Sequence, residues 1–568
     1  MGTLERRGCL RWGGQPVKFF RHIQRGIVED IRMPDLESYA LSAEFVPQLI
    51  GNQGVPSFRV ITPANRLFTL CLAALTALHC LHAAQAEDVS TKRPNVLYIF
   101  TDDQSVRTLG CYSRDAYPWV KTPNIDALAK TGVRFHSVYM AAYCMPARIS
   151  MLTGNLPHAS RGLFQGAELK GAALEKEIQD HPFWPQRLRE SGYRTGMIGK
   201  WHITSRPPAV GIDWDSAIHW SKDMGGSYYH HPMSFNGAPP KDDDGYSVDR
   251  YTDLAIDFLK EQPKDPRPWY LWLCYTGVHM PTEPADRHKG ALGSVDDIPE
   301  PASMRQRAGK PAYIRDLPER SWTRVQDAIR RYHECVMAID ESVGRLMQAL
   351  KTTNQLENTV VIFASDQGIA YGQHGLVHKK DAPYDAALRS PLIFSWPGHF
   401  AQDQVSEEPV NGPDVVRTLL DIFGLEPLKT MDGMSLLPLL KDPAQRLSRE
   451  AMLTTNVQNN MGQSIPQGVA RTERLIARGA KGEEAMRDWA MIRTGDYKYI
   501  GYCGEANEEE IYNLADDPEE LVNLADTEHR TLVEEMRRKA AKELRATQSG
   551  FDRGHYIDFF PLLKQQPN

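Results

Sequence analysis

The sequence predicts an α/β fold with a mostly parallel central sheet, followed by a smaller α+β domain at the carboxyl end. Continuous apolar runs at residues 95–100, 269–275 and 359–365 are typical of parallel strands that are buried on both faces. Residues 322–351 carry apolar side chains at helical spacing and predict one long helix. Long apolar strands separated by helical segments are the pattern of an α/β sheet.

The smaller domain is predicted to begin near Ala451. Short strand patterns occupy residues 489–493, 497–502 and 510–513, and a charged helix follows at about residues 526–545. Strands grouped before a helix, rather than alternating with helices, indicate an α+β unit.

Length and charge exclude some classes of protein. The chain has 568 residues, which is more than a single core usually serves, so two packed units are expected. Lys and Arg number 66 against 72 Asp and Glu, a net charge of −6, which argues against a general nucleic-acid binder. The apolar fraction of 41% is typical of a soluble globular protein.

An apolar run at residues 67–82 follows Arg66 and precedes Ala84-Gln85-Ala86. This arrangement predicts a signal peptide at residues 66–86 that is cleaved after Ala86, with an exported protein, periplasmic or secreted. The run is short and interrupted for a stable membrane span.

Residues 1–65 remain an unassigned amino-terminal extension. They are unexpected in front of a signal peptide, because signal peptides begin near residue 1. One interpretation is that translation starts downstream, at Val55 or Val60; the other is an unusually long leader.

Acidic and amide side chains follow two of the predicted strands. Asp102 and Asp103 come directly after the first run, and Asp366 and Gln367 follow the strand at residues 359–365. Ligands bind beyond the carboxyl ends of strands in α/β sheets, although paired Asp residues at such places often form only a turn or a helix cap. Hard oxygen donors suit Ca²⁺ or Mg²⁺ rather than zinc.

A second feature is the segment that begins at Cys144. Residues 133–139 predict a strand that leads into it, and Pro146 fits the first turn of a helix. Arg148 lies four residues after Cys144, on the same helix face, so we expect it to lean back over the sulfur. The helix start favours negative charge. A buried structural cysteine is the alternative interpretation.

Further histidines and lysines follow strands or loops. Lys200 and His202 lie two residues apart, on the same side of a segment that we expect to be extended. His279 follows the strand at residues 269–275, and the pair Lys379 and Lys380 lies between His374-Gly375-Leu376 and Tyr384-Asp385.

Residues 144–148, with Ala147 at the fourth position, resemble the sulfatase signature Cys-x-Pro-Ser/Ala-Arg. The other motifs occur in the order of that family, and the resemblance covers roughly residues 93–530. It implies an alkaline-phosphatase-like sandwich with helices on both faces of the sheet. The catalytic domain is expected at residues 93–445, and the α+β subdomain at residues 451–550.

The resemblance also implies a reaction, the hydrolysis of a sulfate ester. In the family the cysteine is oxidised to formylglycine, the nucleophile, by a formylglycine-generating enzyme. One divalent metal, Ca²⁺ ahead of Mg²⁺, is then expected on five residues: Asp102, Asp103, Cys144, Asp366 and Gln367. The family usually has Asn or His where Gln367 stands.

The remaining site residues receive their roles from the same resemblance. Arg148 and Lys200 hold the nucleophile and stabilise charge, and His202 is the expected base. His279 is the expected acid, and it grips the sulfate together with Lys379 or Lys380, both of which fit the motif spacing.

The substrate class stays open at this point. A sulfated small molecule or glycan is expected, with carbohydrate favoured because the family is largely carbohydrate-active. Hydrolysis of a phosphomonoester, phosphodiester or phosphonate is an alternative, since relatives with the same nucleophile do that chemistry. A non-catalytic binding protein with unmodified Cys144 is another.

Overall fold

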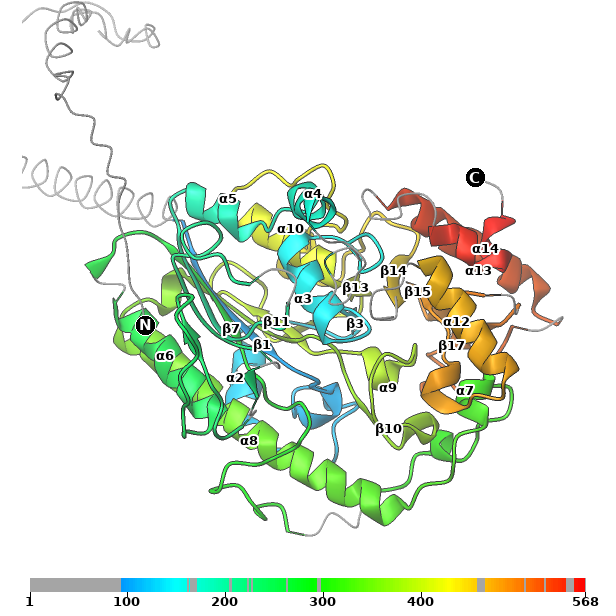
Figure 1. The fold of residues 1–568 in the computed structure, drawn as a ribbon. Helices are drawn as coiled ribbons and strands as arrows, with labels where there is room; N and C mark the ends of the chain where they lie inside the picture. The colour runs from blue at the N-terminus through cyan, green and yellow to red at the C-terminus, as the bar shows by residue number, and fades with distance from the viewer. Residues whose placement is uncertain are drawn as a thin grey trace, which may run out of the picture. The chain divides into compact units, whose positions relative to one another are not determined.

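The computed structural model describes residues 93–566, with gaps at 161–162, 164–170, 204–206, 222–223, 226–227, 262–263, 294–297, 457–464, 505–506, 526–527 and 548–555. The extension at residues 1–65 and the expected signal peptide at residues 66–86 lie outside the described residues. All described residues belong to one compact unit, Ala86–Asn568 (Figure 1).

A nine-stranded sheet forms the centre of this unit, in the order β12-β2-β11-β8-β1-β7-β4-β5-β6. The strands β8, β1, β7, β4 and β5 are parallel neighbours, whereas β11 is antiparallel to both β8 and β2. The strands are β1 (Asn95–Thr101), β2 (Gly132–Phe135), β4 (Arg194–Lys200), β5 (Ser216–Trp220), β6 (Ser234–Phe235), β7 (Trp269–Cys274), β8 (Thr359–Ser365), β11 (Leu392–Ser395) and β12 (Gln404–Ser406). The mostly parallel α/β sheet predicted from the sequence is confirmed.

Helices cover both faces of the sheet, as Figure 1 shows. Successive residues of β1 point to opposite faces, so Leu97 packs in the cluster that contains α2, α6 and α8, and Tyr98 packs in the cluster that contains α3, α5 and α10. The helices are α2 (Pro123–Lys130), α3 (Cys144–Thr153), α5 (Pro185–Glu190), α6 (Ser247–Glu261), α8 (Trp322–Thr352) and α10 (Gly412–Phe423). The long helix expected at residues 322–351 is therefore present as α8.

One predicted strand is wrong in its extent. Residues 133–139 do not form a single strand, because the chain leaves the central sheet at His136-Ser137. Before that break β2 pairs with β11, and after it β3 (Val138–Tyr139) pairs in parallel with β13 (Val410–Asn411). The change of partner turns the chain toward the start of α3.

A second, four-stranded antiparallel sheet lies near the carboxyl end, in the order β14-β15-β16-β17. Its strands are β14 (Met452–Asn456), β15 (Trp489–Thr494), β16 (Tyr497–Tyr502) and β17 (Glu509–Asn513). Helix α13 (Arg530–Ala546) packs on it, with α12 (Ile465–Ala477) and α14 (Pro561–Lys564) nearby (Figure 1). We call this sheet with α12 and α13 the C-terminal subdomain.

Short elements complete the described part of the chain. They are α4 (Ala172–Asp180), α7 (Ala312–Arg315), α9 (Asp385–Leu388), α11 (Leu437–Lys441), β9 (Ala370–Tyr371) and β10 (Val377–Lys379). Among the described residues, no helix is both long and apolar enough to cross a membrane. The five cysteines in this part of the chain are all free thiols.

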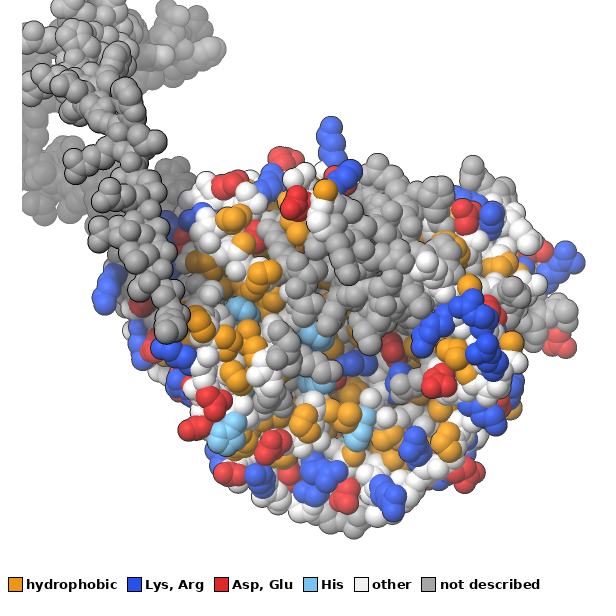
Figure 2. Space-filling model, in the orientation of Figure 1, with side chains coloured by type: hydrophobic (Ala, Val, Ile, Leu, Met, Phe, Trp, Pro, Cys, Tyr) orange, Lys and Arg blue, Asp and Glu red, His pale blue; other side chains and the backbone are white. Residues whose placement is uncertain are grey.

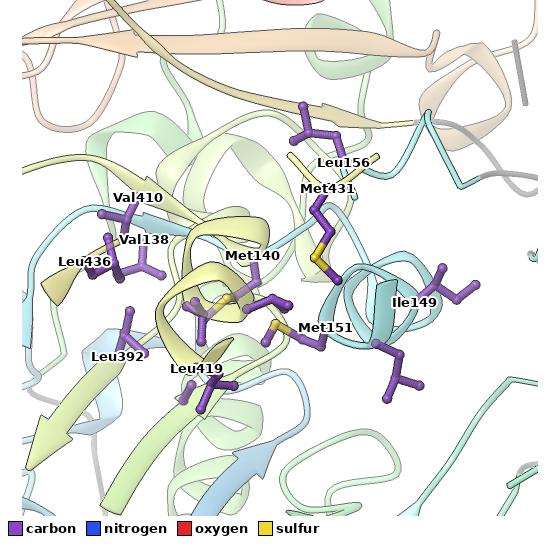
Figure 3. Close-up of a cluster of buried hydrophobic side chains, with 14 of the residues drawn as sticks. Val138, Met140, Ile149, Met151, Leu156, Leu392, Val410, Leu419, Met431 and Leu436 are labelled. Atoms are coloured by element: carbon purple, nitrogen blue, oxygen red, sulfur yellow. The ribbon is translucent and has the colours of Figure 1, made fainter. Parts of the chain in front are cut away.

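The hydrophobic core fixes the position of α3. In Figure 3, Met140 and Met151, the latter on α3, lie beside Leu419 of α10. Met431 lies close to the same two helices, α3 and α10. These side chains are buried, so shifting α3 would open apolar volume and cost several kcal/mol, as large-to-small core changes do. The helix that begins at Cys144 is therefore held from its buried face.

Candidate active site

Four neighbouring strands bring the predicted site residues to one edge of the central sheet. Asp102 follows β1, and Asp366 follows β8, its direct parallel partner. Lys200 is the last residue of β4, and His279 comes five residues after β7. The carboxyl ends of parallel strands meet at one edge, which is where ligands bind in such folds.

Cys144 lies at the centre of this group, as the first residue of α3, and its side chain is buried. Its sulfur is 3.5 Å from Asp102 Oδ1 and 3.0 Å from Lys380 Nζ. Burial raises the pKa of the thiol and so does Asp102, but Lys200 and Lys380 outweigh both and hold it well below its ordinary value. The site is therefore built to hold negative charge at residue 144.

Arg148 is held by two acceptors at the ends of two strands of the sheet. Its Nη2 donates to Asp102 Oδ2 at 2.8 Å and its Nη1 donates to the carbonyl oxygen of Lys200 at 2.6 Å. The guanidinium also interacts electrostatically with Cys144. Burial acts to lower the pKa of Arg148, but Asp102, Asp366 and Cys144 act against burial and raise that pKa. Arg148 thus ties α3 to two strand ends.

Lys200 completes the surroundings of Asp102. Its Nζ lies 2.6 Å from Asp102 Oδ2, the oxygen that Arg148 also contacts. Burial raises the pKa of Asp102, but Lys200, His279 and Arg148 outweigh it and hold that pKa well below its usual range. Asp102 is ionised in this arrangement despite being completely buried.

The two adjacent lysines separate in the structure. Lys380 Nζ lies 2.8 Å from Asp103 Oδ1 and 3.0 Å from the Cys144 sulfur. Lys379 Nζ instead pairs with Asp381 Oδ1 at 3.0 Å. The structure therefore brings Lys380, and not Lys379, to the residues around Cys144.

Two histidines lie near the Cys144 thiol. His202 and His279 both interact with the Cys144 side chain. His279 Nε2 is also 3.7 Å from Asp103 Oδ2, and His279 Nδ1 lies 2.5 Å from the carbonyl oxygen of Met280. The extended segment predicted from Lys200 to His202 is wrong at its last residue, because β4 ends at Lys200 and His202 has a φ of 57°.

The pKa values of the two histidines move in opposite directions. Burial and the Lys200 ammonium lower the pKa of His202. Burial and Lys200 also act to lower the pKa of His279, but Asp103 and Cys144 outweigh them and raise it. The surroundings thus favour a neutral His202 and a protonated His279.

The remaining expected metal ligands form an oxygen-rich group. Asp366 Oδ1 accepts from the backbone N–H groups of Asp103 and Gln367, both at 2.9 Å, and the Gln367 amide contacts Asp103 Oδ1. Within the described residues, Asp366 Oδ2 and Gln367 Oε1 are buried without a hydrogen-bond partner. Burial and the neighbouring Asp102 carboxylate raise the pKa of Asp366 well above its usual value.

These observations fit a hard divalent cation. Three carboxyl groups and an amide oxygen converge, and two of their oxygens have no hydrogen-bond donor in the described part of the chain. The oxygen and nitrogen of an amide are assigned from their surroundings, so rotating the Gln367 amide would turn its oxygen toward Asp103. Such a donor set suits Ca²⁺ or Mg²⁺.

Sequence reasoning missed two tyrosines that hydrogen-bond to the backbone of site residues. The Tyr332 hydroxyl on α8 donates to the Asp103 carbonyl oxygen at 2.5 Å and accepts from the Ser105 N–H at 2.8 Å. It supports Asp103, whose φ of 60° is unusual for an aspartate. Tyr228 donates in the same way to the His279 carbonyl oxygen at 2.8 Å. In the sequence Tyr332 is one more buried aromatic on a long helix, with no signal of its role.

The surface in Figure 2 has a mixed charge. Lys and Arg side chains are interspersed with Asp and Glu over the coloured part of this face, and histidine side chains appear near its centre. The positive charge beside Cys144 comes from Arg148 and Lys200, which are buried, and from Lys380, whose side chain is 24% exposed.

Comparisons with known proteins agree with this geometry. The model of the Sulfatase family matches residues 94–425. An N-acetylglucosamine-6-O-sulfatase of Bacteroides thetaiotaomicron is 27% identical over 524 residues, covering 80% of this chain and 86% of the relative. The human N-acetylglucosamine-6-sulfatase is 29% identical over 467 residues, covering 77% of this chain and 82% of the relative.

Solved structures give the same result. A protein solved in complex with its substrate D-glucosamine-2-N,6-O-disulfate superposes with a TM-score of 0.66 at 25% identity, covering 79% of this chain and 99% of that chain. A phosphonate monoester hydrolase of Agrobacterium radiobacter shares the fold, with a TM-score of 0.59 at 22% identity. Because the family model spans more than half of the chain, and relatives along most of its length are sulfatases, this chain belongs to the sulfatase family and is a sulfuric ester hydrolase.

Proposed function

We propose that this sulfatase hydrolyses a sulfate ester of a sulfated carbohydrate, with a formylglycine derived from Cys144 and one bound Ca²⁺. The observation that carries the proposal is the convergence of Arg148, Lys200 and Lys380 on Cys144 and the two neighbouring aspartates. Fixed cations around a buried reaction centre stabilise the negative charge of a sulfate more strongly than they would in water.

Asp102, Asp103, Asp366, Gln367 and residue 144 would hold the Ca²⁺. The bound cation supplies a Lewis acid for a sulfate oxygen, and the oxidised residue 144 supplies an oxygen nucleophile. Arg148 keeps Asp102 oriented, because it holds this carboxylate and the end of β4 together. Lys200 balances the charge of the same carboxylate, and its ammonium lies close enough to stabilise charge at residue 144.

In this proposal the two histidines are the general base and the general acid. His202 reaches residue 144 from β4 and is placed to take a proton from the nucleophile. His279 reaches it from the end of β7 and is placed to give a proton to the leaving oxygen. Lys380, which contacts both Asp103 and Cys144, is placed to bind a sulfate oxygen, whereas Lys379 is paired with Asp381.

The substrate class rests on the relatives. N-acetylglucosamine-6-sulfatases are found among them in bacteria and mammals, and a related structure holds a glucosamine disulfate. A 6-O-sulfated glucosamine is therefore the first substrate to test. Other relatives are an ulvan-active sulfatase of Formosa agariphila and a choline-sulfatase of Rhizobium meliloti, so those substrates belong in the same panel.

Purified enzyme from a host that forms formylglycine should be assayed for release of inorganic sulfate from sulfate esters, and for release of the alcohol or phenol from phosphorus esters. The panel contains N-acetylglucosamine 6-sulfate, glucosamine 2-N,6-O-disulfate, an ulvan oligosaccharide, choline sulfate, an aryl sulfate, an aryl phosphate and a phosphonate monoester. We expect the highest kcat/KM on a sulfated sugar and a lower value on the phosphorus esters. Preferred hydrolysis of choline sulfate or of a phosphonate would refute the carbohydrate assignment.

A mass spectrum tests the nucleophile separately. Oxidation of the Cys144 thiol to an aldehyde removes sulfur, so the tryptic peptide that contains residue 144 should show the corresponding mass deficit. Ala147 replaces the more common Ser of the signature, so we expect conversion that is substantial but incomplete. A fully unmodified thiol in protein that turns over sulfate esters would contradict the proposal, and an unmodified, inactive protein would support a binding function.

We also propose that the protein is exported. The apolar run at residues 67–82 and the Ala84-Gln85-Ala86 site support this, and both lie outside the described residues. Amino-terminal sequencing of the protein from its native host should begin at or near Glu87. A mature protein that retains residues 1–65 would refute it.

A further inference from the structure

Lys380 sits on a short connection after β10 and before α9. The residue that follows it, Asp381, makes the contacts that fix this connection. Its backbone N–H donates to the carbonyl oxygen of Ala142 at 2.9 Å, two residues before Cys144. Asp381 therefore binds the lysine segment to the segment that carries the nucleophile.

The other side of Asp381 is held by the C-terminal subdomain. The Trp489 indole Nε1 donates to the Asp381 carbonyl oxygen at 2.8 Å, and Asn456 Nδ2 donates to the same oxygen at 3.3 Å. These two residues face each other across β15 and β14, and both are buried. Asp381 has a φ of 67°, a conformation that a non-glycine residue keeps only where its surroundings impose it.

A second anchor holds the far end of the same connection. The Asp385 backbone N–H donates to Glu520 Oε2 at 2.8 Å, and Lys498 Nζ donates to Asp385 Oδ1 at 2.9 Å. Lys498 lies on β16 and Glu520 lies shortly after β17. The whole stretch from Lys380 to Asp385 is thus fixed to the C-terminal subdomain at both ends.

From this geometry we propose that Trp489, assisted by Asn456, is a positioning residue for catalysis: by holding the Asp381 carbonyl it sets the place of Lys380 beside residue 144. The proposal rests on the proposed function, because it assumes that Lys380 binds the sulfate group. Neither Trp489 nor Asn456 touches Cys144 or the metal-ligand candidates through any contact the structure gives. Of the contacts between the C-terminal subdomain and this stretch, the one to the Asp381 carbonyl lies next to Lys380 in the chain.

Trp489→Phe is the sharpest test, because it keeps an aromatic ring and removes the indole N–H that reaches Asp381. It also removes ring volume from a buried side chain, so the control must carry the same change. Trp269→Phe is a matched control: this buried tryptophan also donates one indole hydrogen bond, at 2.8 Å to Gln355, at the far end of β7 from the site. Asn456→Ala removes the other donor to the same carbonyl, in case the larger substitution unfolds the subdomain.

The readout is the dissociation constant of inorganic sulfate, measured by calorimetry on Ca²⁺-loaded protein with equal formylglycine content. Loss of one hydrogen bond should weaken sulfate binding by about 3- to 10-fold in Trp489→Phe, and Trp269→Phe should match the parent. Lys380→Ala should weaken it further. In the Lys380→Ala background, Trp489→Phe should change it by less than about 2-fold, because the two residues act on one interaction.

Each outcome decides the matter. Unchanged sulfate binding in both Trp489→Phe and Asn456→Ala, or losses that multiply in the double variant, would overturn the positioning role. An aryl sulfate assay on the parent separates this from a failure of the proposed function. A parent that cleaves sulfate esters while the losses multiply refutes only the role of Trp489, whereas a parent that neither binds nor cleaves them refutes both.

Discussion

Replacing Tyr332 by Phe should weaken metal binding, although Tyr332 is not itself one of the expected metal ligands. The hydroxyl makes two buried hydrogen bonds, to the Asp103 carbonyl and from the Ser105 N–H. Asp103 is one of the expected metal ligands, and its left-handed φ of 60° is supported by this contact. The substitution therefore loosens a ligand residue without changing the donor set.

The loss of stability follows from the two backbone groups that lose their hydrogen-bond partner, the Asp103 carbonyl and the Ser105 N–H. Each buried polar group that loses its partner costs about 1–3 kcal/mol, so the free energy of unfolding should fall by about 2–6 kcal/mol. Groups that orient metal ligands typically change metal affinity by about 10- to 100-fold, and we expect the lower end because the Asp103 carboxylate keeps its contacts with Lys380 and Gln367.

Tyr112→Phe is a closely matched control. The Tyr112 hydroxyl also donates to a backbone carbonyl, that of Phe135 at 2.9 Å, with a longer contact of 3.4 Å to that of Leu392. It accepts from the Leu392 N–H at 2.9 Å, away from the site. Both variants should lose similar stability in urea titrations of Ca²⁺-free protein. Only Tyr332→Phe should show the higher Ca²⁺ dissociation constant in calorimetry. Equal Ca²⁺ affinity in Tyr332→Phe and the parent would refute this reasoning.

Three further predictions concern the nucleophile, the metal and pH. Cys144→Ala and Cys144→Ser should both lose essentially all sulfate release, because neither supplies the oxidised nucleophile in a host that converts only Cys. Both should keep the parent fold by circular dichroism. Turnover at the parent rate by Cys144→Ala would contradict the proposal. Removal of divalent ions with a chelator should abolish activity, and Ca²⁺ should restore it better than Zn²⁺ because all expected protein donors are oxygens; full activity of a demetallated sample would rule this out. Burial lowers the pKa of His158 to about 3, so the unfolded chain binds the proton first, and the free energy of unfolding should fall by up to about 4 kcal/mol as the pH drops from 6.5 to 3. Above pH 7 this contribution is fully present, and His158→Gln should show a flatter pH dependence in urea titrations; identical slopes for both proteins would contradict it.

Much of the fold was accessible from the sequence because buried parallel strands have a strong signal. The runs that became β1, β7 and β8 are apolar on both sides, and polar residues follow β1 and β8 directly. The break between β2 and β3 was not accessible, since His136 and Ser137 carry no Gly or Pro and each half pairs with a strand from a distant part of the chain.

The site was accessible where a residue follows a strand or begins a helix. Asp102, Asp366 and Cys144 meet because strand ends and a helix start meet at one edge of the sheet. The choice between Lys379 and Lys380 required coordinates, because β10 ends at Lys379 and alternation along a strand does not extend past its end. Tyr332 and Trp489 required them too, because each acts on a backbone atom, and backbone contacts leave no residue pattern.

The burial of Cys144 has a consequence for the timing of maturation. The lysine that contacts its sulfur is encoded 236 residues later, and Asp381, which pairs with Ala142, follows directly. At typical synthesis speeds of about 5–20 residues per second, roughly 10–50 s pass between the appearance of the thiol and that of the segment that contacts it. If Cys144 is oxidised as proposed, the oxidising enzyme would reach the thiol most easily in that interval, before the residues that enclose the cysteine have been added.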